Sequence, residues 1–389
     1  MQDVLERARA QADEFIAIRR DIHSEPELGF QEHRTSALVA EKLGWYGYEV
    51  HRGLGGTGVV GVLKRGNGTK RIGIRADMDA LPIVESTGLA YASRRSGVMH
   101  ACGHDGHTAM LLAAARQLAE HGRYSGTLNL IFQPAEEGQG GAVKMIEDGL
   151  FEKHPCDAVF AMHNSPGNPQ GQFSFRDGAA MASSDYAKIT VTGVGGHGAF
   201  PHLSADPVVA ASGIVMALQT IVSRNVGPLQ TAVVTVGTLH AGAANNVIPG
   251  IATMELSIRA LDREVRDLLE KRIREIAQAQ AASYGCTATV DYQRRYSVLV
   301  NTKAETDFAR QVALDLVGPE NVLLDREPVT GSEDFAFMLE KVPGCYLYIG
   351  NGDGSDSRMC HHPGYNFNDA NLSLGSAYWV ALAERYLQG

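Results

Sequence analysis

Short apolar runs alternate with amphipathic helical patterns in the N-terminal part of the chain, from position 1 to position 183. The runs that predict strands are GVVGVLKR (58–65), RIGIRAD (71–77), TLNLIFQ (127–133) and DAVFAMH (157–163). The patterns that predict helices cover 31–46, 107–120 and 140–149. Because strands alternate with helices and some strands are almost wholly apolar, we expect an α/β domain with a mixed, largely parallel sheet flanked by helices.

Residues 184–297 follow a different order. Their periodicities predict strand, helix, strand, strand, helix, strand, which is the order of a ferredoxin-like α+β sandwich. After them, GCYLYIG and NLSLGSAYWVALAERYLQ predict one more strand and one more helix of the first domain. We therefore expect a discontinuous catalytic domain, 1–183 and 298–389, with an inserted lid and dimerisation domain at 184–297.

Composition and charge exclude several classes of function. The 389 residues are 44% hydrophobic and 20% charged, as in a globular protein, and the net charge of −9 without a Lys/Arg stripe argues against a nucleic-acid binder. The segment from Met1 to His23 mixes charged and apolar positions at helical spacing, which predicts a single surface helix and not a secretory signal. We also expect no membrane-spanning run. Five cysteines, an odd number spread along the chain, favour a reduced, cytoplasmic setting.

Polar side chains stand at the carboxyl ends of the predicted strands. Asp77 and Asp79 follow one strand, Glu136 and Glu137 follow the next, and His163 ends a third. In open α/β sheets ligands bind in the crevice beyond these ends, so we expect the candidate site there.

The segment MHACGHDGHTAM (99–110) combines a cysteine with three histidines. Thiolate and imidazole together suit zinc or a similar transition metal. Cys102 and His104, two residues apart on an extended or loop backbone, can point to the same side. The alternative interpretation is a buried cysteine beside surface histidines.

Three further candidates also have ordinary explanations. Of the adjacent pair Glu136 and Glu137, one can ligate metal while the other acts as general base, although two successive glutamates are often a solvated turn. His163 could equally be a hydrogen-bonded core histidine. The histidines of CHHPGYNFND (360–369) could belong to a polar turn.

Taken in order, the motifs resemble those of one family. They are HSEPELGFQE, RADMDALP, MHACGHDGHT, FQPAEEG, AMH, GHGAFPH, NNVIPG, GSEDFAF and HHPGYNFND. Together they span the chain and are similar to the M20 metallopeptidase family, in its branch of hippurate hydrolases, aminoacylases and indole-acetyl-amino-acid hydrolases.

This resemblance implies two divalent metal ions per subunit. Cys102 would bridge them, His104 and His163 would complete one ligand set, and Glu137 and His361 the other. The family pattern, a histidine two residues before the proline, selects His361 over His362. Glu136 would be the general base. Zinc is the first candidate ion, with manganese, cobalt or nickel as alternatives.

The resemblance also implies roles for four residues beyond this ligand set. Asp79 would be an acid that orients a ligand or Glu136, the alternative being an ordinary loop-capping aspartate. His197 would stabilise the oxyanion, delivered across a dimer or by domain closure. Asn246 and Arg259 would clamp the substrate carboxylate, although Arg259 alternates with apolar residues as a solvent-facing strand arginine does.

We therefore expect metal-dependent hydrolysis of the amide bond of N-acyl-amino acids by a homodimer or higher homo-oligomer. A dipeptidase or aminoacyl-peptide hydrolase would use the same chemistry on a substrate with a free amino group. A protein that only binds metal or a small molecule would not need Glu136, which is present here.

Overall fold

The computed structural model describes residues 2–388, which form two compact units. The second unit consists of Ala179–Leu299 and Pro328–Glu333, and the first contains the remaining described residues. Its bounds are wider than the predicted 184–297. The short second segment joins it because the Ala182 amide donates to the carbonyls of Val329 and Gly331, at 3.1 and 2.9 Å. No periodicity in the sequence indicates that contact.

An eight-stranded mixed sheet forms the centre of the first unit, in the order β1-β2-β4-β3-β5-β16-β6-β15. The strands are β1 (Glu49–Leu54), β2 (Gly58–Arg65), β3 (Arg71–Asp77), β4 (Gly126–Gln133), β5 (Ala158–Pro166), β6 (Phe173–Ser174), β15 (Val322–Leu323) and β16 (Gly344–Gly352). The four central strands β4, β3, β5 and β16 are parallel to one another. The predicted fold class is confirmed, and β1 is a strand that the sequence pattern did not indicate.

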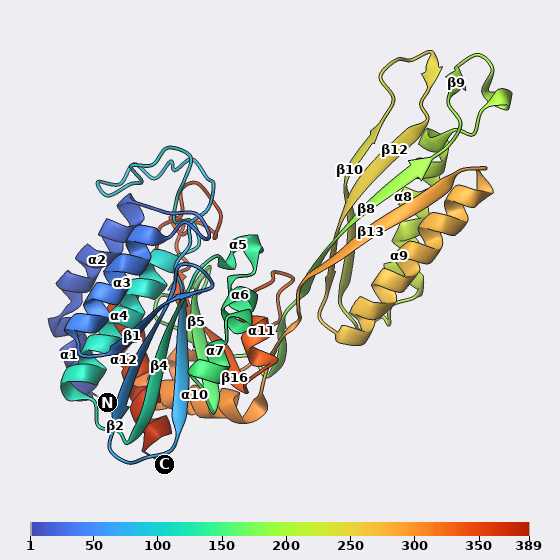
Figure 1. Ribbon diagram of the computed structural model, residues 1–389. Helices are drawn as coiled ribbons and strands as arrows, with labels where there is room; N and C mark the ends of the chain where they lie inside the picture. The colour runs from blue at the N-terminus through green and yellow to red at the C-terminus, as the bar shows by residue number, and fades with distance from the viewer. Residues whose placement is uncertain (1, 389) are drawn as a thin grey trace. The chain divides into compact units, whose positions relative to one another are not determined.

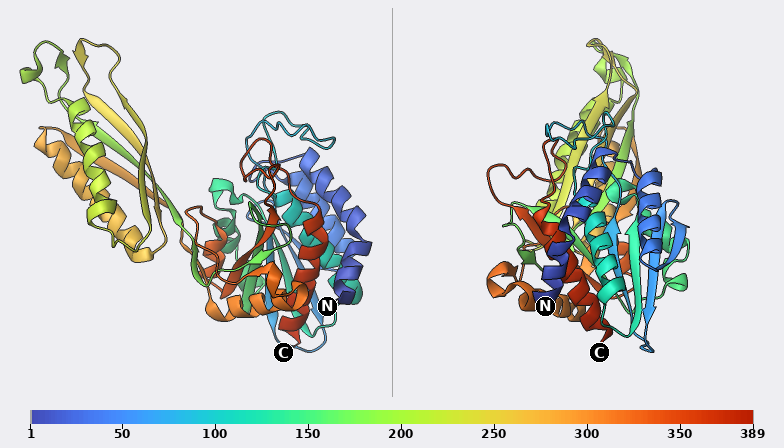
Figure 2. Two further views of the ribbon diagram at one scale, coloured as in Figure 1. Left: turned by 180° about the vertical axis from the view of Figure 1, so that it is seen from behind. Right: turned by 90° about the vertical axis from the view of Figure 1, so that its left-hand side faces the viewer.

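Helices cover both faces of this sheet (Figures 1 and 2). The first face carries α3 (His33–Trp45), α4 (His104–His121), α10 (Lys303–Val317) and α12 (Ala370–Leu387), with α1 (Gln2–Ala10) and α2 (Ala12–Ser24) packed on α4 and α12. The second face carries α6 (Gly141–Glu147) and α11 (Phe335–Leu339), with α7 (Leu150–Lys153) beside α6. The single helix expected at the N-terminus is broken at Gln11, and α4 begins three residues before the predicted start.

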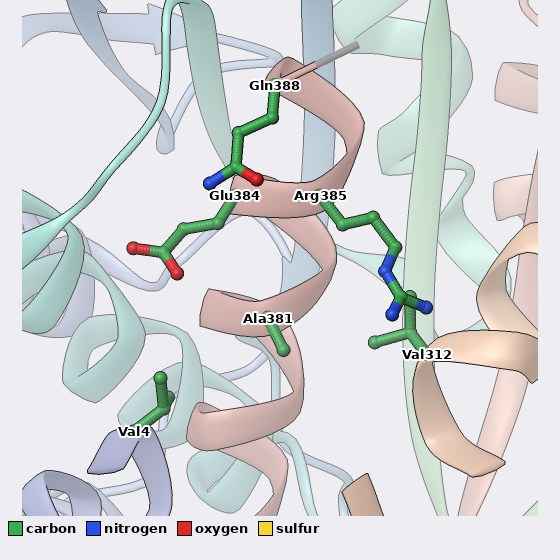
Figure 3. Close-up of a pocket in the computed structure, with 6 residues that line it drawn as sticks. All are labelled: Val4, Val312, Ala381, Glu384, Arg385 and Gln388. Atoms are coloured by element: carbon green, nitrogen blue, oxygen red, sulfur yellow. The ribbon is translucent and has the colours of Figure 1, made fainter. Parts of the chain in front are cut away.

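The most buried helix is α4, whose residues 104–115 are all buried because small and apolar side chains allow close contact with the sheet and α12. A small hollow lies at the far end of α12 (Figure 3). It is lined by Val4, Val312, Ala381, Glu384, Arg385 and Gln388. That hollow contains none of the predicted site residues. The candidate site lies instead at the carboxyl ends of the central strands.

The second unit is a four-stranded antiparallel sheet in the order β10-β12-β8-β13, with two helices packed on it. Its main elements are β8 (Ser183–Thr192), α8 (Pro207–Arg224), β10 (Ala232–Ala241), β12 (Ile251–Ala260), α9 (Arg263–Ser283) and β13 (Thr287–Tyr296). This order of strands and helices is that of the predicted ferredoxin-like sandwich, which is confirmed. At one end of the unit, β9 (Gly196–His197) pairs with β11 (Val247–Ile248).

By length and composition α8 could cross a membrane, with a mean hydropathy of 1.4 over 18 residues, and the expectation that no run has this character is wrong. Ala210, Ile214 and Leu218 bury one side of α8 in the core of the second unit. Val209 and Met216, 50% and 71% exposed, lie on the other side. The helix is therefore a core helix of this unit that also presents an apolar surface.

Candidate metal centre

Four segments that are distant in sequence bring potential metal ligands together in the first unit. Cys102 and His104 precede and begin α4, Glu136 and Glu137 begin the helical turn α5 (Glu136–Gln139) after β4, and His163 lies in β5. His361 comes from the loop between β16 and α12. The parallel register of β3, β4 and β5 places their carboxyl ends at one edge, which explains why these side chains meet.

The donor atoms fall into two groups of three that share one sulfur. Atoms of Cys102, His104 and His163 lie within 4.8 Å of one another, and so do atoms of Cys102, Glu137 and His361. The Cys102 Sγ is 3.3 Å from His163 Nε2, and the Glu137 Oε1 is 3.2 Å from His361 Nε2. A donor of Glu136 lies within the same 4.8 Å limit of His104 and Glu137.

Hydrogen bonds turn the histidine rings so that one nitrogen faces the cluster. His104 Nδ1 lies 2.8 Å from the Asp79 carbonyl oxygen, and His163 Nδ1 lies 2.6 Å from the Asn164 carbonyl oxygen. A ring that donates from Nδ1 presents a lone pair at Nε2. His104 Nε2 is buried and has no hydrogen-bond partner among the described residues, so a cation would satisfy it.

His107 lies close to the same cluster but cannot be a ligand in this arrangement. Its Nδ1 is 2.7 Å from Asp77 Oδ1, and its Nε2 accepts from the Asn164 amide at 3.0 Å. Both nitrogens are thus used by protein partners. Asp77 is occupied as well, since its second oxygen accepts from Arg75 Nη1 at 2.7 Å.

Asp79 contacts both halves of the cluster. Its two oxygens accept from the backbone amides of Glu136 and Glu137, at 3.0 and 2.9 Å, while Oδ1 lies 3.3 Å from His104 Nδ1. The geometry therefore combines the two interpretations made from sequence, because Asp79 caps the loop and in doing so fixes the residues that the loop carries.

A buried glutamate that the sequence did not single out braces this loop from behind. Glu32 is fully buried, and its Oε1 accepts from the Ala135 amide at 2.8 Å while Oε2 accepts from the Thr57 hydroxyl at 2.6 Å. Ala135 has a left-handed φ of 52° directly before Glu136. Burial raises the pKa of Glu32. The sequence signal that could have identified Glu32 is its position at the end of the motif HSEPELGFQE, to which no role was assigned.

Burial and neighbouring groups shift the pKa values of three of these donors. A hydrogen bond with Cys360 and burial raise the pKa of Cys102 well above its usual value. Burial alone would lower the pKa of His104, but the nearby charge of Asp77 raises it strongly. Burial and the adjacent His107 lower the pKa of His163. Thiolate, imidazole and carboxylate donors in two groups fit a pair of divalent transition-metal ions.

The second unit carries the other three predicted residues, and it separates them. His197 and Asn246 lie together at one end, where the Gly198 amide donates to the Asn246 carbonyl at 2.8 Å. Arg259 lies near the opposite end of β12, where its Nη1 donates to Ser332 Oγ at 3.0 Å, and burial lowers its pKa. Eight residue steps from Ile251 to Arg259 correspond to about 26 Å along the strand. Within one chain, Asn246 and Arg259 do not form a clamp.

Comparison with known proteins decides the family. The model of peptidase family M20/M25/M40 matches residues 73–385. The chain belongs to this family. It is 48% identical to the hippurate hydrolase of Campylobacter jejuni, with 96% of this chain and 97% of the relative covered, and 41% identical to IAA-amino acid hydrolase ILR1-like 5 of Arabidopsis thaliana, with 96% and 87% covered.

A solved structure of the same family agrees over the whole chain. It is a dinuclear metal binding peptidase of the M20 family from Bacillus subtilis, which is 34% identical, covers 97% of this chain and 99% of its own, and superposes with a TM-score of 0.85. The resemblance predicted from the ordered motifs is confirmed. Membership of family M20/M25/M40 does not by itself assign a role to any residue of this chain.

Proposed function

We propose that this protein is a metal-dependent amidohydrolase that cleaves N-acyl-L-amino acids into a carboxylic acid and a free amino acid. One observation carries the proposal, namely the two donor groups that share the Cys102 sulfur and have Glu136 beside them. The named activities of the hippurate and IAA-amino acid hydrolases, both related to this chain over nearly its full length, support the substrate class.

The ligand assignment follows the two donor groups. Cys102, His104 and His163 would hold one ion, and Cys102, Glu137 and His361 the other. Two divalent cations, when bound, lower the pKa of a water molecule and polarise the amide carbonyl. The thiolate and imidazole donors favour zinc, and the carboxylate leaves manganese, cobalt or nickel as alternatives.

Glu136 is the general base in this proposal. It takes a proton from the attacking water and then donates that proton to the leaving nitrogen. A carboxylate can do both, because it is a base when ionised and an acid once protonated. Asp79 acts through Glu136. The two Asp79 oxygens accept from the backbone amides of Glu136 and Glu137 and so fix the backbone from which both glutamate side chains extend. Asp79 is thus a positioning residue.

We also propose a homodimer through the second unit. His197 and Asn246 lie at the end of the unit where β12 begins, and Ile251 at that start is about 26 Å along the strand from Arg259 within one chain. A second copy is therefore needed if His197, Asn246 and Arg259 are to serve one oxyanion and one substrate carboxylate. Two exposed features of the unit suit such an interface. The edge strand β10 leaves Leu239 45% exposed, and α8 exposes Val209 and Met216.

The five cysteines of the chain are all unpaired, which supports a reducing, cytoplasmic location as part of the proposal.

Sedimentation at micromolar concentration tests the dimer. A monomer there would contradict it.

The test of the function is amino-acid release from N-benzoyl, N-acetyl, N-indole-acetyl and dipeptide substrates. Chelator-treated protein is assayed with and without zinc, manganese or cobalt. We expect metal-dependent release from the acylated compounds and loss of at least a hundredfold in kcat in Glu136→Gln with metal content unchanged. Release from dipeptides alone would move the assignment to a dipeptidase, and full turnover by Glu136→Gln would refute the role of Glu136.

A further inference from the structure

A second thiol lies beside the shared ligand Cys102. Cys360 lies directly before His361, and its Sγ is 3.9 Å from the Cys102 carbonyl oxygen. Although 258 residues separate the two cysteines in sequence, their backbones adjoin, because the His361 amide donates to the Ala101 carbonyl at 2.7 Å. No role for Cys360 follows from the proposed reaction.

The geometry is suitable for a disulfide. The Cys360 sulfur reaches the backbone of Cys102, and the hydrogen bond between His361 and Ala101 fixes the residues next to both cysteines. A disulfide needs Cα atoms about 4.4–6.8 Å apart, a separation that this close approach allows. Among the described residues, no other two cysteines are joined by a hydrogen bond. Cys345 lies in β16, Cys286 in the second unit, and Cys156 accepts a hydrogen bond from Asn129 at 3.3 Å.

The two thiols differ in exposure and in their other neighbours. Cys102 is 8% exposed and belongs to both donor groups, whereas Cys360 is partly exposed, lies in a solvent-exposed loop and belongs to none of the donor groups found among residues 2–388. Cys360 is therefore the thiol that a small molecule reaches first, and Cys102 is the one whose loss as a ligand would disable both ion sites.

We propose that Cys102 and Cys360 form a reversible disulfide that switches off the metal centre when a small-molecule disulfide oxidises the pair. This inference rests on the proposed function, in which Cys102 is a ligand of both ions. A bridged Cys102 has no thiolate left to offer, so oxidation releases metal and stops hydrolysis together.

The exchange balances without any other reactant. The Cys360 thiolate attacks one sulfur of the small disulfide RSSR, which gives a mixed disulfide and releases one RS⁻. The Cys102 sulfur then attacks the Cys360 sulfur of that mixed disulfide, closes the intramolecular bond and releases a second RS⁻. The two cysteines lose two electrons and two protons, and RSSR becomes two RSH. A dithiol reductant reverses both steps.

Oxidised glutathione is the probe, applied to zinc-loaded protein. Three quantities are measured: the Cys102–Cys360 linkage by peptide mass mapping, the zinc retained after desalting, and hydrolysis relative to each protein's own untreated rate. The variants are Cys360→Ser, with Cys360→Ala in case the hydroxyl disturbs folding, and Cys286→Ser as a matched control that keeps the pair.

We expect wild type and Cys286→Ser to form the linkage, to lose most of their zinc and at least tenfold in rate, and to recover on addition of dithiothreitol and zinc. Both Cys360 variants should keep their zinc and stay within twofold of their untreated rates. Absence of the linkage in wild type, linkage without zinc loss, or equal inactivation of the Cys360 variants would each overturn the proposal. If untreated protein hydrolyses none of the acylated substrates, linkage and zinc retention still decide the switch.

Discussion

Replacing Asp79 by asparagine should damage the stability of the first unit and its activity together. Asp79 is 1% exposed, and its two carboxylate oxygens accept from the amides of Glu136 and Glu137. Asparagine keeps one acceptor but turns an NH₂ donor toward the other amide. A hydrogen bond to a charged acceptor contributes about 1.5–3 kcal/mol, and an unpaired buried donor costs about 1–3 kcal/mol. Since Glu137 is partly exposed and its amide can recruit water, we expect a net loss of about 2–4 kcal/mol.

The same change should lower kcat/KM by at least a hundredfold, equivalent to about 2.7 kcal/mol, because the carboxylate that holds the Glu136 and Glu137 amides and lies beside His104 loses its charge and one of its acceptors. Urea unfolding followed by circular dichroism measures the first quantity, and steady-state hydrolysis of an N-acyl-amino acid the second. Asp262→Asn is the matched control, since Asp262 caps α9 through one bond to the Val265 amide at 2.9 Å and asparagine caps equally well. The reasoning would be refuted by an Asp79→Asn protein that stays within threefold of wild type in kcat/KM and within about 0.5 kcal/mol in stability, the range of an ordinary surface substitution.

Three further predictions concern buried polar groups around the site and away from it. Glu32→Ala should lower the unfolding free energy by about 1–3 kcal/mol and kcat by at least tenfold, because the Ala135 amide loses its acceptor, while Glu32→Gln should recover most of both. Arg75→Met should cost about 3–5 kcal/mol in urea unfolding, because two buried carboxylates lose their cation; a loss below about 1 kcal/mol would contradict this. Burial lowers the pKa of His154 to about 4, so its contribution to stability is present above pH 6.5 and is lost as pH falls from 6.5 to 4. Over that range His154→Asn should lose about 1–2 kcal/mol less of its unfolding free energy than wild type. Equal losses would show that His154 does not contribute.

The parts of the fold that were predictable from sequence are those in which burial leaves a periodic signal. Strands such as 58–65 and 71–77 occupy the predicted residues because most of their residues are buried and their sequences are mainly apolar. The order of elements in the second unit was equally readable. The helix break at Gln11 and the strand β1 were missed because neither changes the periodicity enough to be seen against its neighbours.

Contacts between distant segments were not predictable in this way. The Ala135 amide donates to Glu32, 103 residues earlier, and Cys360 Sγ lies 3.9 Å from the carbonyl oxygen of Cys102, 258 residues earlier. A pattern reports whether a residue is buried and not which partner it meets. The separation of Asn246 from Arg259 was not predicted either. Only a short stretch of sequence joins them, but most of its residues are in an extended strand and therefore span a long distance.

Backbone strain in this protein is concentrated at the proposed metal ligands. Only Phe30, Ala135 and His361 among the described non-glycine residues have a positive φ, and two of them adjoin or supply a proposed ligand. A left-handed conformation costs about 1–2 kcal/mol for such residues, so each needs a compensating contact. Ala135 has Glu32, and His361 has the Ala101 carbonyl.

Those two contacts do more than offset strain. The first fixes the direction in which the chain enters Glu136 and Glu137, and the second joins the His361 loop to the segment that carries Cys102. Three of the four segments that carry the proposed ligands are thereby held by hydrogen bonds that involve none of the donor atoms. It follows that metal removal alone should leave the segments in register, and that the arrangement depends on buried groups such as Glu32 and Asp79 more than on the ions themselves.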